Sequence, residues 1–471
     1  MAIVRNKLTA VLIGVMGVGL VDLYARTIEL IGNMTNFGLS FSAIPKISQI
    51  YDEGDLKAVQ RQVRIIRSLA LLIAVLGVIV GLIAAPWLSL SLQGSYNQTW
   101  AFALLTPAIA FSALTCGESA ILKGTRKLKT IAAISALGAL CTLLITVPLY
   151  FVWGIKGVLP VVVLSCMMLF FLHLRANLKD FPYRLVISRR YLWHKGSPIL
   201  RLGLAYISAG VLGSGAEMLI RAVMMNSDEG LGVVGLYAAG FTLVVSYARL
   251  IFVTMDADYF PRLSVAIHQA QQLNRVVNRQ IDVLVLLMAP FLIVFSLFLP
   301  LIVDILYTRS FYPVIPMVLC ALPFMFFKAI YSPIAYLPLA KGDSKVYFVM
   351  EFIYDVFFTL VVIVGYRHAG LMGAGCGLAL ANFWDLMLLP LVYKRIYGFR
   401  FQSATVCRFV IQGLLLFMGL FLATVNAVGV KILGGIVLCT LSLALSWRLL
   451  QKEIGLNKRF YSIISQLRNR R

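Results

Sequence analysis

Charged side chains within otherwise apolar stretches are the residues of this chain that could do chemistry. A charge at the centre of a bilayer costs about 2.5 to 3.5 kcal/mol on insertion scales, so it normally faces a cavity or a partner rather than lipid. The residues of this kind are Arg26, Glu29, Glu118, Glu217, Arg221, Arg249, Lys328, Glu351, Asp355 and Asp385. They are therefore the first candidates for binding a ligand or for coupling to an ion.

The spacing of four of these charges predicts pairing along a helix. Arg26 and Glu29 are three residues apart, and Glu217 and Arg221 are four residues apart. Residues at these spacings lie on one helix face, so each pair can neutralise itself. The acids expected to couple to an ion or to pair within the membrane are Glu29, Glu217, Asp355 and Asp385.

Two of the cations have no acid at such a spacing. Arg249 and Lys328, if they line a cavity, need an anionic substrate as a partner, because a buried cation without one lacks compensation. Glu351 and Asp355 form an acidic pair four residues apart that repels itself when both are ionised, which suits carriage of a proton. The alternative for every one of these charges is an interhelical pair that holds the bundle together, or a side chain that reaches the interface.

The apolar stretches also contain amide side chains and prolines. Asn33 and Asn36 lie between Gly32 and Gly38 in the second expected span, where polar groups should face the space between the two halves. Prolines that could kink helices are Pro107, Pro290, Pro323, Pro333 and Pro338. Ordinary helix packing is the alternative interpretation of both features.

The composition determines which elements must position these residues. The chain is 61% hydrophobic and 13% charged, and its mean hydropathy is +0.90. Apolar runs such as 69–92, 131–152 and 281–303 exceed the ~20 residues that cross a bilayer as a helix. Alternating segments of about ten residues, which mark β-barrels, are absent. The composition predicts an all-α polytopic membrane protein.

The net charge of +23 is a topology signal rather than a nucleic-acid footprint. Most lysines and arginines fall in loops on one side of the expected membrane, and that side is cytoplasmic by the positive-inside rule. Attraction to anionic membrane lipids follows from the same charge. The cysteines form no C-x-x-C, the histidines lack metal-ligand spacing and a P-loop is absent, so neither a metal nor another cofactor is expected.

An internal repeat organises the chain. The stretch Gly17–Ala25 (GVGLVDLYA) returns as Gly230–Ala238 (GLGVVGLYA), and Gly154-x-x-Gly157 returns as Gly370-x-x-Gly373. The copies are about 215 residues apart, so one half-molecule occurs twice. Two parallel halves of this kind are typical of transporters that open alternately to each side of the membrane.

The repeat predicts two six-helix lobes related by a parallel repeat, two extra C-terminal helices, and about 14 spans, the first truncated. We expect an N-terminal lobe over 1–174, a basic cytoplasmic linker over 175–201, a C-terminal lobe over 202–392, two further helices within 393–447 and a basic, interfacial tail over 448–471. Residues 1–13 should be the end of a first helix of which about half is missing from the chain as written. The other expected spans are 21–44, 68–92, 101–122, 131–152, 158–174, 202–225, 233–257, 281–303, 314–338, 346–365, 371–392, 408–427 and 431–447.

The repeated segments also carry a family resemblance. The run Asn6–Leu20, followed by Asn36-Phe37-Gly38-Leu39-Ser40, resembles the start of bacterial Wzx-type oligosaccharide flippases, which belong to the multidrug/oligosaccharidyl-lipid/polysaccharide (MOP) exporter superfamily. The resemblance implies a flippase that moves undecaprenyl-pyrophosphate-linked oligosaccharide repeat units across the bacterial cytoplasmic membrane by alternating access, for polysaccharide or O-antigen biosynthesis. It implies no enzymatic activity and a multi-pass protein of that membrane.

The resemblance further implies a cationic cavity that accepts pyrophosphate or acidic sugars. In this sequence the candidates are Arg26, Arg221, Arg249 and Lys328, with Asn33 and Asn36 as polar lining. The implied partners are the lipid-linked glycan, anionic lipids, and the polysaccharide polymerase and chain-length machinery, with no nucleic acid.

Two other functions stay open at this point. A multidrug exporter of the same superfamily should have a cavity dominated by acids and aromatic residues, which Arg249 and Lys328 oppose. A membrane polysaccharide polymerase or ligase should have a large extracytoplasmic loop, and the expected outer loops are short.

Overall fold

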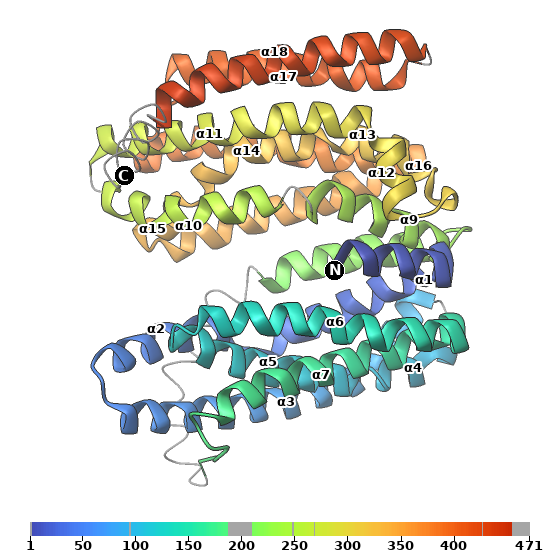
Figure 1. The fold of residues 1–471 in the computed structure, drawn as a ribbon, viewed down its shortest axis with the longest axis vertical. Coiled ribbons are helices and arrows are strands. Elements are labelled where there is room, and N and C mark those ends of the chain that lie inside the picture. Colours follow the sequence, from blue (N-terminus) through green and yellow to red (C-terminus); the bar gives the residue numbers. More distant parts are fainter. Residues whose placement is uncertain are drawn as a thin grey trace, which may run out of the picture. The chain divides into compact units, whose positions relative to one another are not determined.

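The computed structural model describes residues 2–93, 96–186, 210–246, 249–267, 269–425 and 427–454. Within these ranges the chain is almost entirely helical and contains no β-strand (Figure 1). Contacts divide it into two compact units, Met1–Ala238 with Leu306–Phe311 (unit 1) and Ala239–Ile305 with Tyr312–Arg471 (unit 2). The lobe boundaries expected from the repeat stay predictions. The two units are defined by which residues lie close together, whereas the lobes are defined by which residues correspond in the sequence repeat.

Unit 1 is built from long helices joined by short turns. They are α1 Ala2–Thr35, α2 Leu39–Asp52, α3 Leu56–Gln93, α4 Thr99–Ala103, α5 Thr106–Gly124, α6 Leu128–Trp153, α7 Val158–Leu178, the helical residues 210–225 and most of α9 Leu231–Phe241. Short 3₁₀ turns cover Tyr96–Gln98, Gly154–Gly157 and Arg309–Phe311. Residues 202–209 of the expected span 202–225 and most of the expected linker lie outside the described residues.

The first helix, α1, is interrupted at Gly14. Gly14 has φ 65° and ψ −165°, a conformation that favours glycine, so two helical segments meet there. The expected span 21–44 is wrong at both ends. Its helix begins after Gly14 and stops at Thr35, because Phe37 (φ 46°) and Gly38 (φ 61°) form a left-handed turn before α2 begins.

Unit 2 completes the chain with helices that are broken more often. They are α10 Arg249–Ala266, α11 Ala270–Leu297, α12 Leu299–Leu306, α13 Val314–Ala321, α14 Pro323–Ala335, α15 Leu337–Lys341, α16 Ser344–Tyr397, α17 Ser403–Thr424 and α18 Val428–Ile454. A π-helical turn, Thr242–Ser246, follows α9. Residues 455–471 of the expected interfacial tail lie outside the part of the chain described here.

Prolines explain where one expected span divides. The span expected over 314–338 is three helices, with Pro323 in the first turn of α14 and Pro338 in the first turn of α15. Proline suits this position because its missing N–H would have no partner there. Pro290, by contrast, lies inside α11 without dividing it.

The repeat is visible in the backbone. Gly154 has φ 52° and ψ −131°, and its counterpart Gly370 has φ 55° and ψ −143°. Both residues turn the chain between two membrane-length helices. The helices expected over 346–365 and 371–392 are therefore the two halves of α16, which meet at Ala369 and Gly370.

The surfaces of the helices identify a multi-pass membrane protein. Long apolar helices able to cross a bilayer occur in both units, and large apolar side chains such as Ile83, Phe151, Phe421 and Leu433 are exposed on them. An outward apolar face suits lipid rather than water. Within unit 2, α17 and α18 run side by side and both pack against α11 (Figure 1).

Candidate functional site

Five charged residues of unit 1 form one cluster, which we call the α1 charge cluster: Asp22, Arg26 and Glu29 of α1 with Glu217 and Arg221 of the helix 210–225. Arg221 is fully buried and forms an ion pair with Asp22. Its Nη1 lies 3.4 Å from Glu217 Oε2. The ring of Tyr237 lies 5.4 Å from the guanidinium carbon and adds a cation–π contact.

Arg26 is the arginine of this cluster that reaches the surface. Its Nη1 lies 2.7 Å from Glu29 Oε2 and 2.9 Å from Glu217 Oε2, and its Nε lies 3.5 Å from Asp22 Oδ1. Its side chain is 24% exposed and that of Glu29 is 50% exposed. Two arginines facing three carboxylates leave the α1 charge cluster with a net charge of −1 when all five are ionised.

The cluster joins residues that the sequence paired only locally. Arg26, Glu29, Glu217 and Arg221 were expected as two separate helix-face pairs, and they meet across two helices. Asp22 was missed, although it lies four residues before Arg26 on the same helix face. This four-residue spacing is the feature of the sequence that indicates Asp22 as a member of the cluster.

The amides of Asn33, in α1, and of Asn36, directly after α1, make contacts within unit 1. Asn33 Nδ2 donates a hydrogen bond of 3.1 Å to the carbonyl of Gly210, and Asn36 Nδ2 donates to Cys116 Sγ at 3.5 Å. They hold α1 to the helix 210–225 and to α5. Their expected role as polar lining of a cavity stays a prediction.

The repeated glycine stretches meet each other. A Cβ built on Gly19 of α1 would lie 2.8 Å from the backbone nitrogen of Gly235 in α9. The two helices therefore approach backbone to backbone, which only glycine permits. This contact gives a packing reason for the GVGLVDLYA and GLGVVGLYA motifs.

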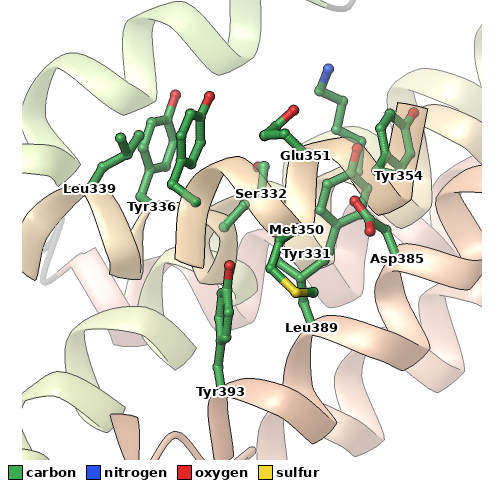
Figure 2. A pocket seen from close by; sticks show the side chains of 13 residues that line it. Tyr331, Ser332, Tyr336, Leu339, Met350, Glu351, Tyr354, Asp385, Leu389 and Tyr393 are labelled. Atoms are coloured by element: carbon green, nitrogen blue, oxygen red, sulfur yellow. The ribbon is translucent and has the colours of Figure 1, made fainter. Parts of the chain in front are cut away.

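Unit 2 contains a cavity of about 240 Å³, which we call the tyrosine pocket. Its lining comes from α14, α15 and both halves of α16 (Figure 2), and consists of Lys328, Tyr331, Ser332, Ala335, Tyr336, Leu339, Tyr347, Met350, Glu351, Tyr354, Asp385, Leu389 and Tyr393. On α16 the lining residues Tyr347, Met350, Glu351 and Tyr354 follow the i, i+3, i+4, i+7 spacing of one helix face. That spacing was the sequence signal for the tyrosines, which the sequence analysis missed.

The pocket combines one lysine with two carboxyl groups. Lys328 and Glu351 line it, and Asp385 does so from the second half of α16 (Figure 2). Asp355 is buried one helical turn beyond Glu351. Lys328, expected to lack an acid partner, therefore lies beside carboxylates that are far away in sequence, and it also faces the ring of Phe324 at 5.7 Å.

Two tyrosines of the pocket are fixed by one buried amide. Tyr331 donates a hydrogen bond of 2.6 Å to Asn382 Oδ1, and Asn382 Nδ2 donates to the Tyr354 hydroxyl at 3.2 Å. Asn382 is fully buried. It is a positioning residue, because it sets the orientation of two rings without lining the pocket.

The remaining candidates have other surroundings. Glu118 pairs with buried Arg67 of α3 at 2.6 Å and accepts a hydrogen bond of 2.7 Å from Asn177, which is a structural pair within the bundle. Next to it, burial and the charge of Glu118 raise the pKa of Tyr183. Arg249 is the first residue of α10, and its side chain lies outside the described part of the structure. Among the described residues, acids, cysteines and histidines form no group able to hold a metal ion.

Comparison with known proteins gives matches in structure and none in sequence. No protein-family model and no curated protein sequence matches the chain. The structure resembles the lipid II flippase MurJ in its inward closed conformation, with a TM-score of 0.71 and 16% identity over 96% of each chain. It also resembles an inward-facing multidrug resistance MATE family transporter of the MOP superfamily, with a TM-score of 0.69 and 15% identity over 83% of this chain and 94% of that one.

A third similar structure is a MOP superfamily transporter from Pyrococcus furiosus that has a binding pocket of reverse polarity. It has a TM-score of 0.55 and 15% identity, and the match covers 88% of this chain and 90% of that chain. The expected fold is confirmed: the chain has the all-α, multi-span fold of MOP superfamily transporters.

Proposed function

We propose that this protein is a flippase that moves undecaprenyl-pyrophosphate-linked oligosaccharide repeat units across the bacterial cytoplasmic membrane by alternating access, for surface polysaccharide biosynthesis. The observation that carries the proposal is the extent of the structural match. The lipid II flippase covers 96% of the chain and the multidrug transporter 83%. The flippase match takes in more of the chain, so the flippase is the better guide to the whole molecule.

The α1 charge cluster supports a role in holding the pyrophosphate. Arg26 is its exposed arginine, and Glu29 beside it is the most exposed of its acids. A guanidinium binds phosphate oxygens in a fork, so a pyrophosphate can take the place of Glu29 on Arg26 when this half-exposed carboxylate turns away, which leaves two arginines facing two carboxylates. Arg221 is buried against Asp22 and Glu217 and acts by positioning them.

The carboxylates of the cluster have a function in the empty transporter. They compensate the two arginines when no substrate is present, so the cluster carries no large unbalanced charge in the low-dielectric interior. Substrate binding exchanges one anion for another, and release on the opposite side restores the original pairs. Arg249 is proposed as a second cation for the same substrate, from the family resemblance alone.

Complementation tests this proposal. The chain is expressed in a bacterium that lacks its own oligosaccharide flippase but makes the matching glycan, and surface glycan is compared with lipid-linked repeat units retained inside. We expect surface glycan to return and the retained units to fall. Retention at the level of the empty vector, with the protein present in the membrane, would contradict the proposal.

A second candidate function is export of organic cations. The tyrosine pocket favours it, because acids and aromatic rings dominate the lining around Lys328. Its volume of about 240 Å³ opposes it, since pockets for drug-sized ligands span about 300 to 1,000 Å³. Survival of drug-sensitive cells in cationic dyes and antibiotics, with and without the chain, tests this candidate separately.

A further inference from the structure

We propose that the tyrosine pocket of unit 2 binds one sugar ring of the transported glycan, and that it accepts uncharged or amino sugars and rejects acidic ones. This inference rests on the proposed function, and it names the part of the substrate that unit 2 recognises. It also replaces the expected role of Lys328 as a pyrophosphate ligand.

Two polar atoms in the pocket have no hydrogen-bond partner within the described part of the chain. Asp385 is 6% exposed, and its Oδ1 has no hydrogen-bond partner among the described residues. The buried Oγ of Ser332 is likewise without a partner in that part of the chain. A buried polar atom that stays unpaired costs free energy, so both atoms suit a ligand that brings hydrogen-bonding groups. Sugar hydroxyls donate and accept, which suits a carboxylate and a serine together.

The aromatic rings supply the other half of a sugar site. The face of a tyrosine ring is electron-rich and attracts the positively polarised C–H groups on the flat side of a pyranose. Tyr331 and Tyr354 are held by Asn382, and Tyr393 lies edge-on against Tyr397 with their ring centroids 5.2 Å apart. Rings fixed in this way lose little conformational freedom when a ligand binds.

The charge of the pocket decides which sugars fit. Glu351 and Asp385 line it with Lys328, and Asp355 is buried close by. Carboxyl groups therefore outnumber the cation, and a uronic acid or a phosphate would meet like charge from those that are ionised, in a site of low dielectric. An amino sugar gains from the same charge. The volume of about 240 Å³ is below that of drug-sized sites, which favours a single ring.

The location suits a glycan built in the cytoplasm. Tyr347 lies in the first turn of α16 and Tyr393 in its last turns, close in sequence to Lys341, Lys345, Lys394 and Arg395. These basic residues mark the expected cytoplasmic side. A sugar attached to lipid on that side would meet the pocket at the start of transport.

Saturation-transfer NMR on the purified full-length chain tests the pocket directly. The probes are the methyl glycosides of N-acetylglucosamine, glucosamine and glucuronic acid, and the variants are Asp385→Asn, Tyr393→Leu and Tyr393→Phe. The matched control is Asp258→Asn, the same change on an α10 side chain that is 75% exposed. Thermal unfolding of each preparation establishes that it is folded.

We expect a saturation-transfer signal from the glycosides of N-acetylglucosamine and glucosamine, and a signal at least fivefold weaker from the glucuronide. Asp385→Asn and Tyr393→Leu should reduce the signal at least fivefold, and Tyr393→Phe and Asp258→Asn should retain it. Equal transfer to the glucuronide would overturn the proposal. So would unchanged signals in Asp385→Asn and Tyr393→Leu, or binding of tetraphenylphosphonium that these variants abolish while no glycoside binds.

The same preparations separate this inference from the proposed function. Glycoside binding as described, without translocation of a lipid-linked glycan in vesicles, would leave the sugar site standing and refute the flippase. Translocation that stays at the wild-type rate in Asp385→Asn and Tyr393→Leu would support the flippase and refute the sugar site.

Discussion

At the residue scale, the two arginines of the α1 charge cluster have different jobs. Arg221 has no exposed surface and compensates Asp22 and Glu217, whereas Arg26 contacts the same acids from a partly exposed position. A buried charge that loses its partner destabilises a protein more than an exposed one does. Substitution should therefore separate folding from transport.

Replacing Arg221 should destabilise the folded protein. Arg221→Met leaves Asp22 and Glu217 with one fewer buried cation, and breaking a buried pair of this kind costs about 3 to 5 kcal/mol. We expect a clear drop in the melting temperature of the detergent-solubilised protein and a low amount in the membrane. A melting temperature equal to that of the wild type would show that Arg221 does not hold the cluster together.

Replacing Arg26 should stop transport and spare the fold. Arg26→Ala removes the exposed cation proposed for the pyrophosphate, so surface glycan in the complementation assay should fall at least tenfold while protein levels stay unchanged. Arg262→Ala is the matched control, because Arg262 is an exposed arginine paired with an acid on its own helix. Normal surface glycan in Arg26→Ala would remove Arg26 from the substrate path.

The residue scale is also where sequence reasoning was least complete. Pairs within one helix, such as Arg26 with Glu29, could be predicted because three- and four-residue spacings define a helix face. The acids beside Lys328 could not, since Glu351 and Asp385 come from both halves of α16 and reach α14 only through tertiary packing. Lys328 therefore looked unpaired in the sequence and lines a pocket with two carboxyl groups in the fold.

At the scale of elements, glycines control how helices meet and where they turn. Gly19 and Gly235 permit the close crossing of α1 and α9, and Gly154 and Gly370 turn the chain at equivalent places in the repeat. Each role is a separate physical requirement, contact in the first case and backbone conformation in the second. Alanine substitutions distinguish the two.

The helix crossing predicts a steric penalty. In Gly19→Ala the new methyl group meets the backbone of α9, which cannot move away as a side chain can, and overpacking of this kind costs about 1 to 3 kcal/mol. Gly232→Ala is the control, since a Cβ there has no neighbour within 4 Å. The melting temperature of Gly19→Ala should be well below that of Gly232→Ala, and the opposite order would refute the close crossing.

The turns predict a conformational penalty without a clash. Gly370→Ala places a methyl group in open space, but it forces a non-glycine residue to φ 55° and ψ −143°, a sparsely populated conformation that costs about 1 to 3 kcal/mol. Gly32→Ala, also in open space but inside the helical part of α1, should be neutral or stabilising. Equal melting temperatures for the two variants would show that the break at Gly370 is not required.

The repeat made much of this scale predictable. The equivalent G-x-x-G motifs indicated equivalent turns, and both glycines adopt positive φ. The ends of the helices were harder to predict, because they depend on local turns such as Phe37–Gly38. They also depend on prolines, which begin a new helix in one place and lie inside an unbroken helix in another. Hydropathy alone does not indicate where such breaks occur.

At the scale of the whole molecule, composition and repeat together were enough to predict the class of fold. A chain that is 61% hydrophobic must satisfy its backbone within helices, and two parallel halves with two extra helices restrict the topology further. The solved MOP superfamily transporters confirm that fold. What a protein of this fold transports depends on pocket chemistry that the fold does not determine, since lipid and drug transporters both adopt it.

Translocation of a lipid-linked oligosaccharide in proteoliposomes tests the central claim most directly. Purified protein is reconstituted with a fluorescent polyprenyl-pyrophosphate oligosaccharide, and the fraction of glycan that a membrane-impermeant lectin can reach is followed over time. We predict rapid exchange across the bilayer with the wild type and none beyond protein-free vesicles with Arg26→Ala. Exchange no faster with the wild type than without protein, in vesicles that do accumulate tetraphenylphosphonium, would contradict the flippase and favour an exporter of organic cations.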